Sequence, residues 1–203
     1  MKITEFKYFY PERAGLIHKD QPLFETLSKD PKWIAEPKFN GSRLQLHHLH
    51  DNTWEFWNRH GQKFSYTPSP ELLKDLNGLN LKGYWLLDGE LRHNKVVGVR
   101  DKVVLYDVFV AEGHILNTQT FEERRGILEV LFHYNGPYTG DILDLTAQYD
   151  TNFSKEFERY GDDKEIEGLV LKNLNGKLNL GRTSSPKSTW QFKVRKANNS
   201  VRF

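Results

Sequence analysis

Short apolar runs recur along the first half of the chain, and most of them fit strands better than helices. Each run alternates with polar residues or is continuously apolar, and each is bounded by a turn signal such as Asp51-Asn52. The first two runs meet at Gly41, where we expect a tight bend. The pattern predicts strands over residues 33–39, 42–48, 53–59, 84–91 and 102–110.

Two segments carry the signals of helix starts. Ser69 stands before Pro70 at the head of SPELLKDL, as an N-cap residue followed by proline at the first helical position. Thr120 and Glu123 form a capping box that opens TFEERRGILEVLF, where the large apolar residues share one face. We therefore expect helices to begin at both places.

The last apolar segment, EGLVLKNLNGKLNL, centres on Asn175-Gly176, the dipeptide that type I′ turns prefer, and so predicts a hairpin. Strands thus outnumber helices, and their order is not a regular alternation of the two. The expected fold class is α+β, with mainly antiparallel sheets flanked by helices. No repeat, low-complexity block or Gly/Ser linker interrupts the chain, so we expect a single domain over residues 1–203.

Composition removes several classes of protein. The 203 residues include no cysteine, so the chain has neither a disulfide framework nor a thiolate metal site. The first residues, MKITEFKYFY, lack the apolar centre of a signal peptide, and no window approaches the length of a membrane span. We expect an intracellular, cytoplasmic and soluble protein with no membrane partner.

The net charge of +2 is too small to indicate a nucleic-acid partner by itself. Its distribution is more informative, because cations crowd the end of the sequence. From charge alone, a solvated basic tail and a nucleic-acid-binding surface are equally good interpretations. The residues concerned are Lys187, Lys193, Arg195, Lys196 and Arg202.

The histidines of HHLH resemble a metal site at first sight. Strand alternation, however, places His48 and His50 on one face and His47 on the other, so we expect an exposed strand and no zinc. Trp54 and Trp57 could stack on nucleic-acid bases, but packing within the protein is the better interpretation.

Polar residues interrupt five otherwise apolar segments: KFNGSR, WNRHG, LLDGEL, EIEGLVLK and WQFKVRK. A glycine beside an acid in one strand usually marks only a bulge or a turn. Buried charges, however, are costly unless they are paired. The interruptions are therefore expected to share one polar cleft, through Lys38, Arg43, Arg59, Glu90, Glu167, Lys172 and Lys193.

Several cations with two or more carboxylates suit a polyphosphate bound together with Mg²⁺. The sequence has no Walker-type glycine loop, but a lysine could act as the nucleophile. At a pKa of about 10.4, only roughly one lysine in a few thousand is neutral at pH 7. Neighbouring cations or a metal ion would lower that pKa.

The ordered set KFNGSR, WNRHG, LLDGEL, VLYDVF, EGLVLK and FKVR resembles the motifs of the covalent nucleotidyltransferase superfamily, which comprises ATP-dependent polynucleotide ligases and mRNA capping enzymes. The match runs from about residue 33 to residue 196 in the family's order. The chain is most similar to the adenylation (nucleotidyltransferase) domain of ATP-dependent DNA ligases, an ATP-grasp-like fold. The arginine two residues after Gly41, the NRHG element and AEGHILNTQTFEERRGIL carry this closer resemblance.

The resemblance implies that Lys38 attacks the α-phosphate of ATP, releases pyrophosphate and holds AMP as a phosphoramidate. Glu36 would recognise the adenine amino group, and Tyr106 would stack on the base in place of the more usual phenylalanine. Glu90 would bind the ribose hydroxyl. Together with Glu167, Glu90 would also hold a Mg²⁺ or Mn²⁺ ion.

The resemblance assigns other polar residues to phosphates. Arg43 would contact the ribose and phosphate side of the nucleotide or the nick. Lys172 and Lys193 would bind the α-phosphate, and Arg195 would also bind the nucleotide. The nucleic acid would be contacted by Arg59, Asn40 and Arg182. The implied partner is nicked duplex DNA or RNA.

Three features depart from the family pattern. Asn40 stands where the family usually has aspartate, and Arg195 replaces the second lysine of the last motif, which keeps the charge but changes its geometry. Seven residues follow Lys196, whereas such ligases continue into an OB-fold domain. We expect a minimal ligase, an excised domain, or one half of an enzyme whose OB-fold is a separate chain.

The leading hypothesis is therefore an ATP-dependent DNA ligase that seals 3′-OH and 5′-phosphate ends in DNA repair or replication. An RNA ligase shares the chemistry and stays open. A GTP-using capping enzyme is disfavoured by Glu36. A non-catalytic nucleotide-binding subunit, in which Asn40 and Arg195 mark decay, is the alternative from a different class.

Overall fold

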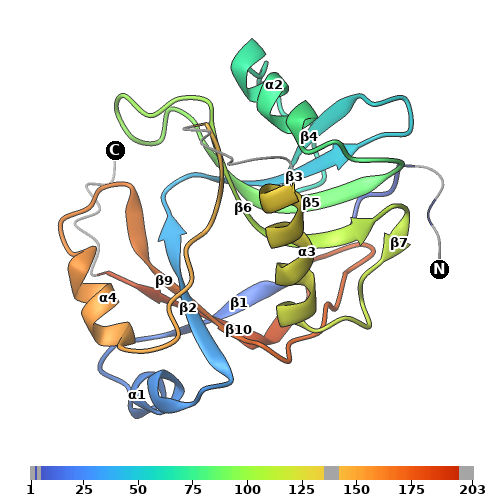
Figure 1. Cartoon of the computed structure of the whole chain (residues 1–203). Coiled ribbons are helices and arrows are strands. Elements are labelled where there is room, and N and C mark those ends of the chain that lie inside the picture. Colours follow the sequence, from blue (N-terminus) through green and yellow to red (C-terminus); the bar gives the residue numbers. More distant parts are fainter. Residues whose placement is uncertain (1–2, 4–5, 135–141, 197–203) are drawn as a thin grey trace.

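The computed structural model describes residues 3, 6–134 and 142–196 (Figure 1). Arg202, the last of the predicted basic run, lies outside the described residues. Within the described part of the chain, no helix is long and apolar enough to cross a membrane.

The strands form two sheets. The smaller has the order β1-β10-β9-β2, and the larger has the order β4-β3-β5-β6-β7, with β8 pairing with β6. Neighbouring strands are antiparallel except in the pairs β1–β10 and β6–β8, so the predicted α+β class is confirmed. The smaller sheet contains β1 (Arg13–Ile17), β2 (Trp33–Phe39), β9 (Ile166–Asn173) and β10 (Lys187–Arg195). The larger contains β3 (Ser42–His48), β4 (Trp54–Asn58), β5 (Trp85–Arg92), β6 (Lys102–Ala111), β7 (His114–Ile115) and β8 (Leu143–Leu145).

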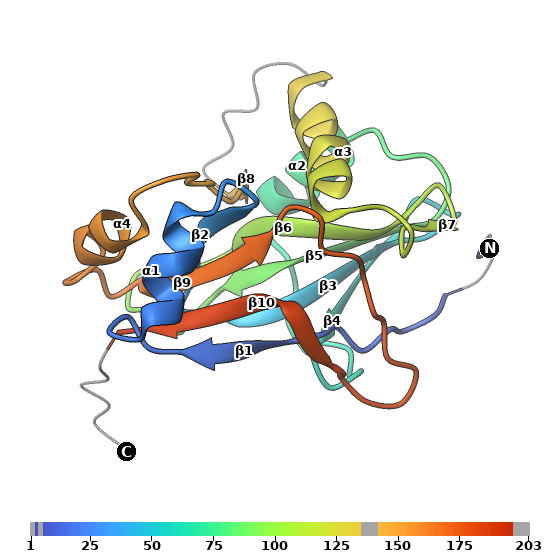
Figure 2. The ribbon, with the colours of Figure 1, turned by 90° about the horizontal axis from the view of Figure 1, so that it is seen from below.

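In the described part of the chain, four helices cover the sheets: α1 (Pro22–Lys29), α2 (Pro70–Gly78), α3 (Phe121–Tyr134) and α4 (Phe153–Arg159). The Ser69 side chain accepts a hydrogen bond from the backbone N–H of Leu72, and Thr120 and Glu123 form their reciprocal capping box, so both predicted starts are confirmed. Helices α2 and α3 pack against the larger sheet, and α1 lies beside α4 near the smaller one (Figures 1 and 2).

Consecutive strands β2 and β3 belong to different sheets. The chain leaves the end of β2 and crosses to β3 through Asn40 and Gly41 (Figure 1). This junction brings the end of the smaller sheet next to β3 and β5 of the larger one. The polar segment KFNGSR therefore lies at the seam between the two sheets.

The expectation of an exposed strand for HHLH is wrong for two of its three histidines. His47 and His48 are buried, because residues on both faces of β3 are covered. On one face, His47 lies 4.6 Å from the ring of Phe6 and its Nδ1 is 2.7 Å from the hydroxyl of Tyr84, and burial lowers its pKa to about 3. His48 on the other face contacts the carbonyl of Gly83 through Nδ1. Among the described residues no three His, Cys, Asp or Glu side chains form a metal-binding group.

The predicted hairpin at Asn175-Gly176 is also wrong. Strand β9 ends at Asn173 and pairs with β2 and β10, and neither Asn175 nor Gly176 has the positive φ of a type I′ turn. The glycine serves packing instead, since a Cβ atom at Gly176 would lie 2.3 Å from the ring of Trp190.

Trp54 and Trp57 pack within the protein, as expected. The ring of Trp57 stacks on Phe6 at 4.7 Å and its Nε1 donates to Glu55. Trp54 lies 4.9 Å from the ring of His48, and its Nε1 donates to Asn77.

Candidate active site

A cleft of about 960 Å³ is lined by strands of both sheets and gathers most of the predicted site residues. The predicted residues that line it are Glu36, Lys38, Arg43, Arg59, Glu90, Tyr106, Glu167, Lys172, Lys193 and Arg195. Two predicted residues stay outside the lining. Asn40 donates its side-chain amide to the carbonyl of Lys164 at 3.3 Å, and Arg182 is exposed beside Thr183, which does line the cleft.

Lys38 lies at the end of β2, opposite Gly168 of β9. Its Nζ forms an ion pair with Glu167 Oε2, and Arg195 Nε lies 3.9 Å from the same oxygen. The Lys38 side chain is 20% exposed, so it reaches the cleft without being free in solvent. One carboxylate thus stands between two cations.

Lys193, on β10, lies among cations. Partial burial lowers its pKa, and the charges of Arg195, Lys38, Arg59 and Arg13 lower it further. A site that disfavours its own positive charge in this way would be stabilised by an anion of several charges. Arg13 also lines the cleft and was not predicted, because it comes from the edge strand β1 and belongs to no recognisable motif.

Glu90, on β5, explains the glycine of KFNGSR. A Cβ atom at Gly41 would lie 2.7 Å from Glu90 Cγ and 3.1 Å from Glu90 Oε1. The expected bend at Gly41 is present, but its φ is not positive, so the position needs a small residue rather than a left-handed backbone. Burial raises the pKa of Glu90 to about 7, although Lys38 and Arg43 act in the opposite direction.

Arg43 is held rigidly on β3. Its Nε and Nη2 donate to the two oxygens of Asp88 at 3.0 and 2.5 Å, and Nη1 donates to the carbonyl of Glu12 at 3.1 Å. Burial opposes the charge of Arg43, but the Asp88 carboxylate outweighs this effect and raises the pKa of the guanidinium. Arg43 is therefore a fixed cation, 5.8 Å from the centre of the Tyr106 ring.

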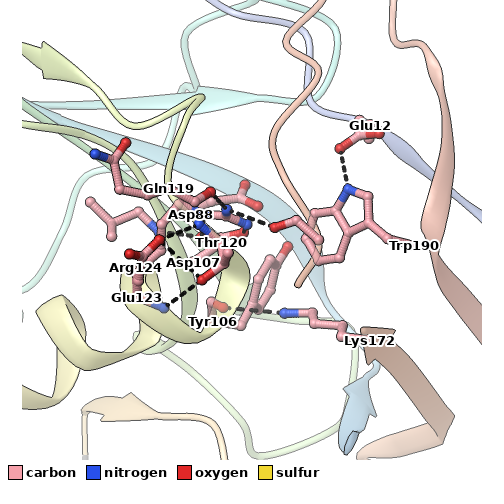
Figure 3. Close-up of polar contacts among 12 residues, drawn as sticks. Glu12, Asp88, Tyr106, Asp107, Gln119, Thr120, Glu123, Arg124, Lys172 and Trp190 are labelled. Atoms are coloured by element: carbon pink, nitrogen blue, oxygen red, sulfur yellow. Dashed lines mark hydrogen bonds and ion pairs between the residues drawn. The ribbon is translucent and has the colours of Figure 1, made fainter. Parts of the chain in front are cut away.

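Tyr106 forms the other end of the cleft, on β6. Burial raises the pKa of its hydroxyl well above the ordinary value, so the phenol is neutral. Lys172 Nζ lies 4.9 Å from the centre of its ring and donates to its backbone carbonyl at 3.2 Å (Figure 3).

Lys172 also pairs with Glu36 at 2.6 Å, and both side chains are only 3% exposed. The ammonium of Lys172 thus lies beside the carboxylate expected to recognise the base. The family resemblance assigns Lys172 and Glu36 to different parts of a nucleotide, and it does not predict that they form a buried ion pair.

A second buried ion pair supports this end of the cleft. Arg124 of α3 donates from Nε and Nη2 to the carboxylate of Asp107 at 2.7 and 3.0 Å (Figure 3). Asp107 directly follows Tyr106 in the chain. Arg124 Nη1 donates to the carbonyls of Gln119 and Gly176. Arg124 has no exposed side-chain surface, so it joins α3 to β6 from within. Asp107 lies in VLYDVF and Arg124 in AEGHILNTQTFEERRGIL, but neither motif predicts that the two side chains pair.

The two ends of the cleft differ in chemistry. An aromatic ring and a paired carboxylate, Tyr106 and Glu36, occupy one end, and Lys38 with its neighbouring cations occupies the other. This order suits a nucleotide whose base contacts the ring and whose phosphates face the cations. Two carboxylates, Glu90 and Glu167, lie near Lys38 at the phosphate end. Mg²⁺ commonly uses one or two carboxylates together with substrate phosphates, so this donor set fits that ion.

No family model matches this sequence, and no curated protein sequence matches it. Solved structures do. A mycobacterial DNA ligase D complexed with ATP and MES matches 96% of this chain with a TM-score of 0.66 and 18% identity. The ATP-dependent DNA ligase of bacteriophage T7, in complex with ATP, matches 92% with a TM-score of 0.56 and 14% identity. An archaeal ATP-dependent RNA ligase matches 92% with a TM-score of 0.53 and 15% identity.

This chain spans 62% of the mycobacterial structure, 68% of the T7 structure and 48% of the archaeal one. The agreement covers nearly all of this chain and extends to both DNA and RNA ligases. The chain therefore has the fold of the nucleotidyltransferase domains of ATP-dependent nucleic-acid ligases.

Proposed function

We propose that this chain is an ATP-dependent polynucleotide ligase that seals 3′-OH and 5′-phosphate ends of nicked duplex DNA. The observation that carries the proposal is the position of Lys38, which lies in one cleft with an aromatic ring and carboxylate at the base end and with cations at the phosphate end.

In the first step, Lys38 Nζ attacks the α-phosphorus of ATP. A phosphorus–nitrogen bond forms, the bond to the pyrophosphate oxygen breaks, and pyrophosphate leaves. The amine attacks in its unprotonated form. Lys193 and Arg195 lie close to it. The same cations would stabilise the negative charge that develops on the transferred phosphate.

At the other end of the cleft, Tyr106 stacks on adenine and Glu36 accepts a hydrogen bond from its amino group. Glu90 binds a ribose hydroxyl, and Arg43 and Lys172 contact the ribose and phosphate side. Glu90 and Glu167 would hold Mg²⁺ or Mn²⁺, which would neutralise phosphate charge and compete with Lys38 for the Glu167 carboxylate.

Sealing then needs two displacements. An oxygen of the nucleic-acid 5′-phosphate attacks the AMP phosphorus and breaks its bond to Lys38. The 3′-OH next attacks the 5′-phosphate, and AMP leaves. Arg59, Asn40 and Arg182 would contact the nucleic acid, together with Arg13 at the rim of the cleft. The same steps serve RNA, so the sugar preference is decided by substrate tests. Any separate OB-fold partner would act at this stage.

The test of the first step is covalent labelling. The chain is incubated with α-labelled ATP and Mg²⁺ and analysed by intact-protein mass spectrometry. We expect one added AMP, absent in Lys38→Ala and retained in the control Lys63→Ala, whose lysine lies on the surface beside Glu55. A label that survives Lys38→Ala would refute the assignment.

A sealing assay then compares nicked DNA, nicked DNA/RNA hybrids and single-stranded RNA under the same conditions. We expect the nicked DNA duplex to be sealed fastest. Sealing of single-stranded RNA alone would reassign the chain as an RNA ligase with the same lysine chemistry.

A further inference from the structure

The carboxylate of Glu36 is held from two sides. Its Oε2 accepts from Lys172 Nζ at 2.6 Å, and its Oε1 accepts from the side-chain amide of Gln148 at 2.9 Å. Both partners are donors, and a carboxylate has roughly four acceptor positions. Glu36, itself 2% exposed, therefore keeps acceptor capacity toward the cleft and presents no donor there.

The backbone sets the position of Gln148. Ala35 and Tyr149 exchange both backbone hydrogen bonds in an isolated antiparallel bridge, at 2.8 and 2.9 Å. In this register, the residue after Ala35 faces the residue before Tyr149, which places Gln148 opposite Glu36. The same segment is held again by Arg125, which donates to the carbonyl of Thr146. The amide thus reaches Glu36 from a fixed support, although Gln148 is absent from the cleft lining.

We infer that Gln148 is a positioning residue that sets purine selection, by fixing Glu36 as a pure acceptor toward the base. An exocyclic amino group, as in adenine, can donate to this acceptor. A carbonyl oxygen at the same position, as in guanine, cannot, and it would leave a buried acceptor facing another acceptor. The inference concerns the base end of the cleft and rests on the proposed function for the identity of the bound nucleotide.

The test measures equilibrium binding of ATP and of GTP to the full chain, for wild type, Gln148→Met and Tyr149→Phe. Methionine has a similar length but no donor. Tyr149→Phe keeps the backbone bridge and removes only the hydroxyl that contacts Tyr160 and Arg159, so it controls for disturbance of this segment. Thermal unfolding shows which variants are folded.

We expect wild type and Tyr149→Phe to prefer ATP, and Gln148→Met to lose about tenfold in ATP affinity while its weak GTP affinity stays the same. A folded Gln148→Met that keeps the wild-type ratio of ATP to GTP affinity would overturn the inference.

Gln148→Glu gives a second readout and carries the test if the methionine variant does not fold. Two facing carboxylates share a proton as the pH falls. The protonated carboxyl can then donate a hydrogen bond to the carbonyl oxygen of guanine. We therefore expect this variant to lose its preference for ATP over GTP as the pH is lowered. The preference of wild type should stay constant. A constant ratio in both proteins would overturn the inference.

Covalent labelling of the same samples separates the two proposals. If Lys38 is labelled but wild type binds ATP and GTP equally, the inference fails and the proposed function stands. If no lysine is labelled but Gln148→Met loses its ATP preference, the inference stands and the proposed function fails.

Discussion

Glu90 is a residue of the cleft whose pKa differs from its ordinary value in a way that can be tested. It lies in the cleft against Gly41, and burial raises its pKa to about 7 from 4.5. It is therefore only partly ionised near neutral pH, even though Lys38 and Arg43 stand nearby. A carboxyl in this state can donate as well as accept a hydrogen bond, which suits contact with a hydroxyl group.

This shift makes stability depend on pH in a defined direction. Because the folded pKa of Glu90 exceeds its unfolded value, the folded chain binds more protons between pH 4.5 and about 7, and its stability falls as the pH rises through this range. Glu90→Gln is neutral throughout, so we expect it to be more stable than wild type near neutral pH, by up to about 3 kcal/mol, and equal to it at about pH 4.

Urea unfolding of both proteins across this pH range measures the difference, with the exposed Glu71→Gln as the control. Parallel stability profiles for wild type and Glu90→Gln would contradict the shifted pKa.

Residues that belong to local motifs could be predicted, and residues brought in from a distance could not. Lys38, Glu90 and Lys193 stand within short polar interruptions of strands, so the sequence marks them. Arg13 and Gln148 stand in segments without such a mark. Strand pairing with distant parts of the chain brings Arg13 to the cleft lining and Gln148 to the carboxylate of Glu36. Periodicity carries no information about these pairings.

At the scale of elements, the strands expected over residues 33–39, 42–48, 53–59, 84–91 and 102–110 and both capped helix starts were predictable because they depend on neighbours in sequence. The short strands β1, β7 and β8 were not predicted. The buried faces were not. Alternation places His47 and His48 on opposite faces of β3, but only the packed structure shows that both faces are covered. The hairpin predicted at Asn175-Gly176 was wrong for a similar reason. A glycine is needed there because the ring of Trp190, distant in sequence, packs against it.

Helix α3 gives a prediction at this scale. Arg124→Met would leave Asp107 buried and without its guanidinium, so we expect a loss of about 3–5 kcal/mol in the free energy of unfolding. Urea denaturation measures this loss. Lys29→Met is the control, because its partner Glu25 and Lys29 itself are both exposed, and we expect little change.

The double variant Asp107→Leu/Arg124→Met removes both charges and should recover part of the loss. A single variant as stable as wild type would show that α3 does not depend on this ion pair.

At the scale of the whole molecule, charge is nearly balanced, with 29 Lys and Arg against 27 Asp and Glu. Attraction for a nucleic acid must therefore come from the local group of cations at the cleft. The charges of Arg13, Arg59 and Arg195 act on Lys193 there. A small group of this kind can neutralise only a few phosphates.

If the chain binds nicked duplex DNA as proposed, we therefore expect the affinity to be modest and to fall only gradually with salt, with a shallow logarithmic slope for a DNA-binding protein. Arg59→Ala and Arg13→Ala should each lower that slope by about 0.9, which is the contribution of one phosphate contact. Fluorescence anisotropy at several salt concentrations measures it, with Lys29→Ala as the control. A weaker affinity with an unchanged slope would show that the arginine does not meet a phosphate.

The division of the chain between the two sheets has a consequence for synthesis. Strands β1 and β2 precede the whole larger sheet in the sequence, and β9 and β10 follow it. A ribosome therefore releases Lys38 early, while Glu167, Lys193 and Arg195 emerge only after the larger sheet is complete. The larger sheet can fold first as a continuous unit, and β2 must wait for β9 to pair with it. The nascent chain thus carries its lysine as an ordinary exposed side chain until the last described strand arrives and the cleft is formed.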